Sequence, residues 1–278
     1  MITDAQIHVW EVDRPDRPWP AVARNQPQLP NGFSAEQAIA AMDEAGVDRA
    51  IIVPPTWIGE NNATGLEAAA RYPGRFAVMG RFDPLRPDAS EALDNWLSTP
   101  GMVGIRMTYR VPPFDRWLDD DTLDGFWDGC ERNGIPVMNL IPLSSAKLPR
   151  ILESHPDLTF IIDHMAVEIE KKGAEAFRTI DALCALAKYP NVYVKVSSAP
   201  NFSVEPYPFR DIWPFLKQIY DAFGPQRLMW GSDLTRLNST YRECLDQWNG
   251  GMDFVSADDA VLICGGNLAR VLRWPETR

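Results

Sequence analysis

The sequence predicts a single α/β domain, a (β/α)8 barrel that spans residues 1–278. Eight short apolar segments rich in β-branched residues alternate along the chain with eight segments of helical character. Strands that are apolar throughout are typical of parallel sheets covered by helices on both faces. Eight such units in a chain of 278 residues fit a closed barrel better than a doubly wound sheet. No linker rich in Gly or Ser divides the chain into smaller domains.

The eight apolar segments are the predicted strands. The first alternates between apolar and polar residues and ends in polar ones, and the others are mostly continuous apolar runs. They cover residues 2–10, 49–55, 76–82, 103–109, 136–141, 158–165, 192–197 and 228–232. Pro-Gly pairs at 73–74 and 100–101 separate helices from the strands that follow them.

The first predicted helix carries both a start and a stop signal. Ser34 and Gln37 have the spacing of a capping box, residues 38–45 follow with a helical pattern, and Gly46 ends it. The other predicted helices cover residues 61–72, 88–97, 121–132, 148–154, 174–188, 211–223 and 257–272.

Residues 11–32 are rich in Pro, Arg and Asp and show no helical period. Such a loop is longer than an ordinary connection between a strand and a helix, and loops of that length are usually functional or disordered. Trp10, Trp19 and Trp57 cluster in the first two of these connections. We expect this loop and Trp57 to shape a lid over the barrel, although Trp is also common in ordinary packing.

Composition narrows the class of partner. Lys plus Arg is 27 and Asp plus Glu is 38, so the net charge is −11, which argues against nucleic acid or an anionic membrane. No apolar run reaches transmembrane length, and the N-terminus lacks the features of a signal peptide. Cys130, Cys184, Cys244 and Cys264 form no Cys-x-x-Cys pair, so we expect reduced thiols in a cytoplasmic protein. The expected partner is a small anionic substrate, and a homodimer stays open.

Asp233 follows the last predicted strand after Gly231 and Ser232. An Asp at the C-terminal tip of a buried strand is poorly explained by packing, because Asp is almost never buried unpaired. In a (β/α)8 barrel this position faces the active-site mouth. The alternative is that Asp233 caps the next helix through the segment Asp-Leu-Thr-Arg. This stretch by itself leaves both interpretations open.

The chain has three histidines, and two of them end predicted strands. His8 ends the first strand and His164 the sixth, while His155 lies in a polar connection on the opposite face. Strand one neighbours strand eight in a closed barrel, so His8, His164 and Asp233 should converge on one mouth. Two imidazoles and a carboxylate suit a divalent ion, or proton transfer around a bound water. For each His the alternative is a core residue hydrogen-bonded to backbone, and this is how we interpret His155.

Arg106, Tyr109 and Arg110 lie on or just after the fourth strand. An arginine fork binds a carboxylate with two hydrogen bonds, so we expect these three side chains to hold a substrate carboxylate. The alternative for Arg106 is a salt bridge within the protein, to an Asp such as Asp83.

Lys195 lies inside the seventh strand. A lysine that points into the barrel near its mouth either pairs with Asp4, Asp163 or Asp233 or binds a substrate anion. The first role would be structural, and the second would place Lys195 in the substrate site.

Several motifs together resemble the amidohydrolase superfamily, and within it the small barrels of the amidohydrolase 2 branch. They are DAQIHVW at strand one, IIDHMAV at strand six, VKVSS at strand seven, WGSD at strand eight and GGNLARVL in the last helix. The resemblance covers nearly the whole chain and rests on the combination of motifs. It implies a hydrolase, since this branch includes lactonases acting on pyrone dicarboxylates, muconolactone-type compounds and sugar lactones. The branch also includes some decarboxylases.

The chain departs from the family pattern at two positions. The first family motif is usually His-x-His, both metal ligands, but here Gln6 precedes His8. The strand-five position, where many members carry a metal-binding His or a carboxylated Lys nearby, corresponds to Asn139. His164 matches the strand-six His and Asp233 the catalytic Asp. Amide oxygens bind hard ions weakly, so we expect either no metal or a weakly bound divalent ion such as zinc, with His8, His164 and Asp233 as its candidate ligands.

Residues and resemblance together predict hydrolysis of a small lactone or related cyclic ester that carries a carboxylate. Asp233 would take the proton from the attacking water, while His164 and His8 would polarise the carbonyl or hold the water. The expected substrate-binding residues are Arg106, Tyr109, Arg110, Asn139, Trp57 and Lys195. One alternative is metal-dependent decarboxylation of an aromatic or unsaturated acid, and another is an inactive barrel that only binds a small ligand.

Overall fold

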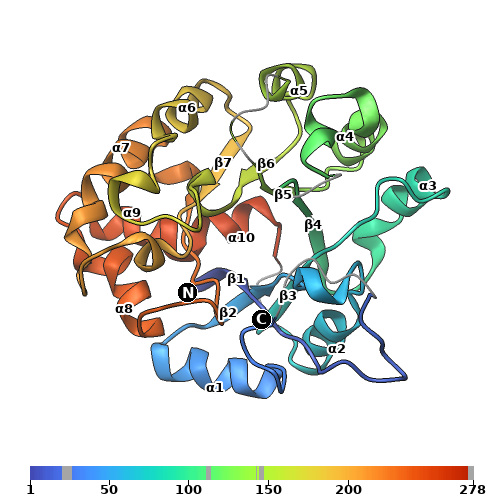
Figure 1. Ribbon diagram of the computed structural model, residues 1–278, viewed down its shortest axis with the longest axis horizontal. Helices are drawn as coiled ribbons and strands as arrows, with labels where there is room; N and C mark the ends of the chain where they lie inside the picture. The colour runs from blue at the N-terminus through green and yellow to red at the C-terminus, as the bar shows by residue number, and fades with distance from the viewer. Residues whose placement is uncertain (21–26, 111–113, 142, 144–146, 275–278) are drawn as a thin grey trace.

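The protein is a barrel of eight parallel strands surrounded by helices (Figure 1). The structure, a computed structural model, describes residues 1–20, 27–110, 114–141, 143 and 147–274. The strands pair in sequence order and are β1 Thr3–Ile7, β2 Arg49–Ile52, β3 Phe76–Gly80, β4 Met102–Thr108, β5 Val137–Leu140, β6 Phe160–Ile162, β7 Val192–Lys195 and β8 Leu228–Met229. The predicted fold class is therefore confirmed.

Backbone hydrogen bonds between β1 and the segment that contains β8 close the barrel. The amide of Ala5 donates to the carbonyl of Trp230 at 3.1 Å. Further along, the amide of His8 donates to the carbonyl of Leu234 at 2.7 Å. These bonds carry the pairing beyond the short β8 strand, and they bring the ends of the first and last strands to the same mouth.

The helices are α1 Ala35–Ala45, α2 Ala63–Arg71, α3 Ala89–Asp94, α4 Asp124–Arg132, α5 Leu148–Ser154, α6 Ile180–Ala185, α7 Trp213–Phe223, α8 Tyr241–Asp246, α9 Ala257–Val261 and α10 Asn267–Val271. The predicted capping box of Ser34 and Gln37 begins α1, and Gly46 ends it with a φ of 75°. Helix α8 was not predicted, although Thr240 and Glu243 form a second capping box at its start.

The predicted closing helix over residues 257–272 is interrupted. A wide turn, Leu262–Gly266, separates α9 from α10. Gly265 lies against the start of the chain, where a Cβ atom would stand only 2.4 Å from the Met1 carbonyl oxygen. A side chain at this position would collide with backbone, so the close approach of the N-terminus requires glycine.

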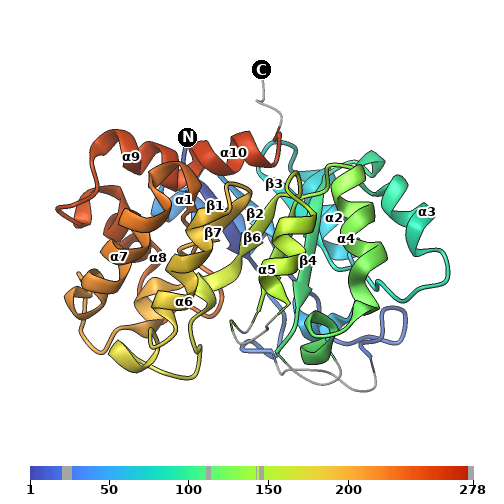
Figure 2. The same cartoon turned by 90° about the horizontal axis from the view of Figure 1, so that it is seen from above.

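The barrel interior is a separate core from the one between strands and helices. Ala5, Met138 and Met229 are among the inward apolar side chains, and Leu268 and Leu272 of the α10 region pack against this group. Figure 2 shows α10 lying across the side where β1 begins. This end is therefore plugged, which leaves the opposite face, where the strands end, as the open mouth.

An aromatic group lies beside the mouth. Trp10, Trp57 and Ile58 are buried together, with Trp19 and Phe33 packed against them. The rings of Trp10 and Trp57 meet edge to face with their centroids 5.1 Å apart. The predicted clustering of tryptophans is confirmed, while part of the predicted lid, residues 21–26, lies outside the described residues.

Two further expectations concern the chain as a whole. All four cysteines are free, and three of them are buried. Within the part of the chain that the structure describes, no helix combines the length and the apolar character needed to cross a membrane.

Candidate active site

A cavity of about 290 Å³ opens at the mouth of the barrel. Five residues that the sequence placed in the site line it, namely His8, Trp57, Arg106, His164 and Asp233. They come from the position directly after β1, the loop after β2, β4, the turn after β6 and the segment after β8. Parallel strands that end on one face bring these distant residues together.

An irregularity in β1 aims Gln6 into this cavity. The register between β1 and β2 shifts between Asp4 and Ile7, which interrupts strict alternation of side chains. The Asp4 carboxylate accepts hydrogen bonds from the backbone N–H of Gln6 at 2.8 Å and from the backbone N–H of Ser232 at 2.9 Å. It also accepts one from the Tyr241 hydroxyl at 2.6 Å. Asp4 therefore ties β1 to the segment after β8, and burial raises the pKa of its carboxyl even though these hydrogen bonds lower it.

Asp233 adopts a left-handed backbone with a φ of 60° directly after the last strand. The backbone N–H of Asp233 donates to the backbone carbonyl of Gln6 at 2.9 Å, and this bond holds Asp233 at the cavity wall. The helix that follows, α8, is capped by Thr240, so the alternative in which Asp233 caps that helix is wrong. Asp tolerates this backbone region better than most residues do, and here the turn directs its carboxylate toward the cavity.

His8 and Asp233 lie within hydrogen-bonding distance of each other. The ring Nδ1 of His8 lies 2.7 Å from the Val53 carbonyl, which can only accept, so Nδ1 carries a hydrogen. The ring Nε2 lies 3.0 Å from Oδ1 of Asp233. Both of these atoms accept, so a hydrogen bond between them requires a proton on one of them. Burial alone raises the pKa of the Asp233 carboxyl, but the two imidazoles beside it, His164 and His8, lower it by more, so the net direction is downward.

His164 turns into the cavity from a strained turn. His164, Met165 and Ala166 all have φ angles between 50° and 57°. Non-glycine residues rarely adopt this region, and such strain often accompanies functional sites. The ring Nδ1 lies 2.8 Å from the Ser197 hydroxyl. Burial lowers the pKa of His164 to about 4, so the ring is neutral at pH 7.

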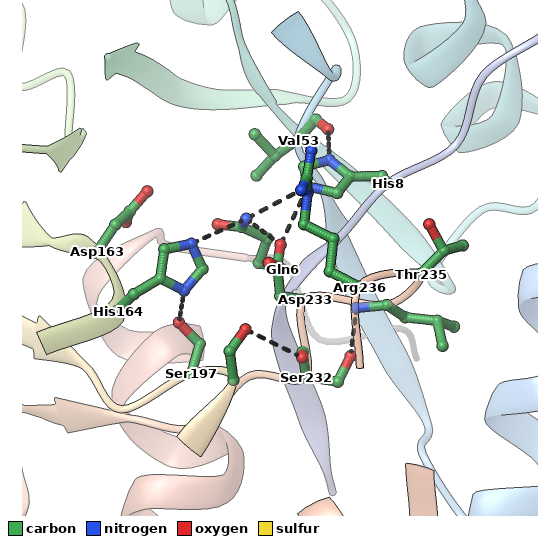
Figure 3. A network of polar contacts seen from close by, with 12 residues as sticks. Gln6, His8, Val53, Asp163, His164, Ser197, Ser232, Asp233, Thr235 and Arg236 are labelled. Carbon is green, nitrogen blue, oxygen red and sulfur yellow. Dashed lines mark hydrogen bonds and ion pairs between the residues drawn. The ribbon is translucent and has the colours of Figure 1, made fainter. Parts of the chain in front are cut away.

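The Gln6 carboxamide occupies the centre of the site (Figure 3). Its Nε2 lies 2.5 Å from Oδ1 of Asp233, 3.4 Å from Nε2 of His164 and 3.5 Å from Nε2 of His8. Its Oε1 accepts a hydrogen bond from the Lys195 ammonium. Because an ammonium can only donate, this bond fixes the orientation of the amide, and the NH2 group faces the two imidazoles and the carboxylate.

Lys195 belongs to a buried charge network. Its Nζ lies 2.8 Å from Oδ1 of Asp163, and the Nε of Arg106 lies 2.9 Å from Oδ2 of the same carboxylate. Burial by itself raises the pKa of Asp163, but the neighbouring charges of Lys195 and Arg106 lower it by more, and the net result is a pKa of about 2. The pairing of Lys195 with an aspartate is confirmed, and Lys195 does not line the cavity. Arg106 pairs with Asp163, so the suggested bridge to Asp83 is wrong.

Tyr109 and Asn139 do not line the cavity, because each sits one residue away from an inward-facing position. Side chains alternate along a strand, so Tyr109 faces outward when Arg106 and Thr108 face inward. Tyr109 is fully buried and packs near Trp127, with ring centroids 6.5 Å apart. Asn139 faces outward in the same way and donates to the carbonyl of Val137 at 2.8 Å.

Arg110 also lies off the cavity. Its guanidinium pairs with the exposed Glu170, with Nη2 to Oε2 at 2.9 Å. The expectation that Tyr109, Asn139 and Arg110 lie at the substrate is therefore not met by their placement. His155 bonds to the Ile151 carbonyl and to Asp128, away from the mouth, as its structural interpretation required.

Two other arginines, which were not expected from the sequence, also line the cavity. Arg81 follows β3, and its Nη1 donates to the Thr108 hydroxyl at 3.0 Å. The same hydroxyl accepts from Nη1 of Arg106 at 2.6 Å. Arg236 lies over the Trp57 ring, 5.8 Å from its centroid. The rule that located His8 and His164, a polar residue at a strand end, would also have found Arg81.

The donor set does not fit a resident divalent ion. Among the described residues no three His, Cys, Asp or Glu side chains form a group that could hold one. The reason lies in the chemistry at the centre of the site, where the NH2 of Gln6 points at both imidazoles and at Asp233. An amide N–H donates and cannot ligate a cation, while Lys195 holds the oxygen of the same amide.

Comparison with known protein families accounts for the arrangement. The family model described as "Amidohydrolase" matches residues 3–274. The chain belongs to the amidohydrolase family. The resemblance found in the sequence motifs is thereby confirmed.

Among curated relatives, an L-fucono-1,5-lactonase of Burkholderia ambifaria is 26% identical over 97% of this chain and 94% of that protein. A 4-sulfomuconolactone hydrolase of Rhizobium radiobacter is 26% identical over 83% of this chain and 74% of its own. Among solved structures, an amidohydrolase from Burkholderia multivorans with bound zinc has a TM-score of 0.81 at 23% identity and covers 99% of this chain and 100% of its own. A 5-carboxyvanillate decarboxylase from Sphingomonas paucimobilis has a TM-score of 0.63 at 15% identity and covers 98% and 99%. At these identities the two solved structures show a shared fold.

Proposed function

We propose that this amidohydrolase-family member hydrolyses a small lactone that carries a carboxylate or another anionic group. The observation that carries the proposal is the Asp233 carboxylate, which is held through Oδ1 by Gln6 and His8 at the wall of the cavity. The two curated relatives described above are both named for lactones, which supports the class of substrate.

Asp233 acts as the base in this proposal. Its Oδ2 makes no hydrogen bond to any of the described residues, so it can accept a proton from a water in the cavity. That water attacks the lactone carbonyl, and the ring C–O bond then breaks. In this proposal His8 is protonated on Nε2 and passes that proton to the departing ring oxygen, and the product is a hydroxy acid. General acid–base catalysis of this kind contributes about 10²- to 10⁴-fold.

The anionic group of the substrate binds along the arginine wall of the cavity. Arg81 and Arg106 are each only 4% exposed and line the cavity, in a protein whose net charge is −11. A guanidinium recognises a carboxylate or sulfonate through fixed N–H donors. Trp57 provides an apolar wall for the lactone ring, and Arg236 lies over this indole.

The reaction proceeds without a resident zinc ion in this proposal, because the amide of Gln6 stands among the candidate ligands. The same reason disfavours metal-dependent decarboxylation, the second activity found in the branch that the motifs resemble. If the protein were instead an inactive barrel that only binds a ligand, the lactone would bind without turnover.

The test uses two lactones taken from the names of the relatives. Hydrolysis of 4-sulfomuconolactone and of L-fucono-1,5-lactone is followed by acid release with a pH indicator, and CO2 is measured in parallel. We expect turnover of the anionic lactone, and Asp233→Asn should lower it by about 10²-fold or more while the protein stays folded. Asp128→Asn, the same chemical change on the outer surface of α4, is the matched control.

Three results would count against the proposal. Wild-type rates in Asp233→Asn would exclude Asp233 as the base. Release of CO2 from an aromatic acid without lactone hydrolysis would indicate a decarboxylase. A rise in melting temperature with the lactone, without acid release, would indicate a barrel that only binds.

A further inference from the structure

The side-chain amide of Gln6, at the centre of the site, has one N–H without a short hydrogen bond among the described residues. Nε2 of Gln6 carries two hydrogens, and Asp233 takes one of them at 2.5 Å. Among the residues that the structure describes, the other faces the ring nitrogens of His164 and His8, at 3.4 and 3.5 Å, which are long contacts. Gln6 lines the cavity, so this N–H is placed to donate to an oxygen of a bound substrate.

The far end of the same amide is bonded to the amine of Lys195, whose pKa burial lowers while the neighbouring Asp163 raises it and favours the ammonium. Lys195 is fully buried, and its ammonium donates to Oε1 of Gln6. Its other polar contacts are Oδ1 of Asp163 at 2.8 Å and the sulfur of Met138 at 3.4 Å. A donor on the oxygen of an amide draws electron density from the nitrogen, which makes the N–H on the other side a stronger donor.

The charges around this amide favour a developing anion. Lys195 and Arg106 are the cations of the buried network, and Asp163 is the carboxylate between them. This buried network therefore holds two cations and one carboxylate, and so carries excess positive charge within a protein whose net charge is −11.

We propose that the Gln6 carboxamide, polarised by the Lys195 ammonium, is the electrophile that stabilises the oxyanion during hydrolysis, in the role that a divalent ion plays in metal-dependent hydrolases. A catalytic metal polarises a carbonyl as a Lewis acid. Here the N–H of Gln6 donates to the carbonyl oxygen of the lactone and binds it more strongly as negative charge develops. Gln6 is then a catalytic residue and Lys195 a positioning residue. The inference rests on the proposed lactone hydrolysis.

Metal binding tests the inference without any substrate. Chelator-treated wild-type protein is titrated with Zn²⁺ by calorimetry, in parallel with Gln6→His. Wild type should bind weakly, and the variant should bind at least 10-fold more tightly, because a ring nitrogen then joins His8 and Asp233 as a ligand. Stoichiometric zinc in untreated wild type, lost together with activity on chelation, would overturn the inference.

Kinetics test the electrophile itself. Gln6→Glu keeps the shape of the side chain and removes the N–H, and it should lower kcat by about 10²-fold or more with a small effect on KM, as loss of one oxyanion donor does. Lys195→Met should lower kcat in the same direction and leave KM largely unchanged. Lys217→Met, on the surface of α7, is the control.

Lys195→Met also removes a partner of Asp163 and so puts folding at risk. The double variant with Lys195→Met and Asp163→Asn removes both charges of this pair, and circular dichroism and melting temperature check its fold. It should remain slow in kcat. A folded double variant, or Gln6→Glu, with wild-type kcat would overturn the inference. If Asp233→Asn also leaves turnover unchanged, the proposed function fails as well, whereas loss only in Asp233→Asn contradicts this inference alone.

Discussion

Acidification should destabilise the protein through His164 before it protonates Asp163. The ring is buried at the mouth, and its pKa falls from 6.5 to about 4 because burial disfavours the imidazolium. In the unfolded chain His164 takes up a proton near pH 6.5, but in the folded protein it does so only near pH 4. The unfolded state therefore binds more protons between these values, and the free energy of unfolding falls as the pH is lowered through this window.

The size of the effect follows from the gap between the two pKa values of His164. Each pH unit corresponds to about 1.4 kcal/mol at 25 °C, so the gap between 6.5 and about 4 is worth about 3 kcal/mol. The carboxyl of Asp163 contributes in a lower window, since its pKa falls from 3.8 to about 2 and its stabilising contribution is lost only below pH 3.8. Measurements between pH 7 and pH 4.5 therefore exclude Asp163. Burial raises the pKa of the Asp4 carboxyl, which acts in the opposite direction in this range, so the comparison of a histidine variant with wild type isolates the contribution of His164.

The assay is urea unfolding followed by tryptophan fluorescence at several pH values from 7 to 4.5. The slope of unfolding free energy against pH is compared for wild type, His164→Asn and the control His155→Asn. His155 is bonded to a surface carboxylate outside the cavity, so its variant controls for the removal of a histidine elsewhere in the fold. His164→Asn should lose a large part of that slope, whatever its stability at pH 7. Parallel curves for wild type and His164→Asn would refute the reasoning, because the folded ring would then titrate as it does in the unfolded chain.

Two further predictions concern the charged groups around the cavity. Asp163→Asn leaves Lys195 and Arg106 buried without their carboxylate, so urea unfolding at pH 7 should show a loss of about 3–5 kcal/mol; a loss below about 1 kcal/mol would mean that the network is solvated. Arg106→Met should raise KM for 4-sulfomuconolactone roughly 10-fold or more, because a hydrogen bond to a charged group is worth about 1.5–3 kcal/mol. The KM for the uncharged L-fucono-1,5-lactone should rise much less. Tyr109→Phe, outside the cavity, is the control and should leave both KM values unchanged. Equal changes for the two lactones in Arg106→Met would restrict this arginine to its bond with Asp163.

The alternation of apolar strands and helices was enough to predict the barrel. Because parallel strands of a barrel all end on one face, position at a strand end was enough to bring His8, His164 and Asp233 to a common mouth. The capping box of Ser34 and Gln37 also predicted its helix correctly, since a cap depends only on residues three apart. These features rest on local pattern and on one topological rule.

What the sequence could not decide is which of two neighbouring residues faces inward. A shift of one residue moves a side chain to the other face of a strand, and the register depends on irregularities such as the one between Asp4 and Ile7. For that reason Tyr109 and Asn139 were placed in the site.

The partners of the buried charged residues could not be predicted from the sequence either. Lys195 meets Gln6 across 189 residues of sequence, and both Lys195 and Arg106 meet at Asp163. Three aspartates were open to Lys195 on sequence grounds, and only closure of the barrel brings one of them within bonding distance. The residue types and their strand ends are therefore properties of the sequence. The orientation of Gln6, which decides between a metal ligand and a hydrogen-bond donor, is a property of the tertiary structure, because a distant ammonium sets it.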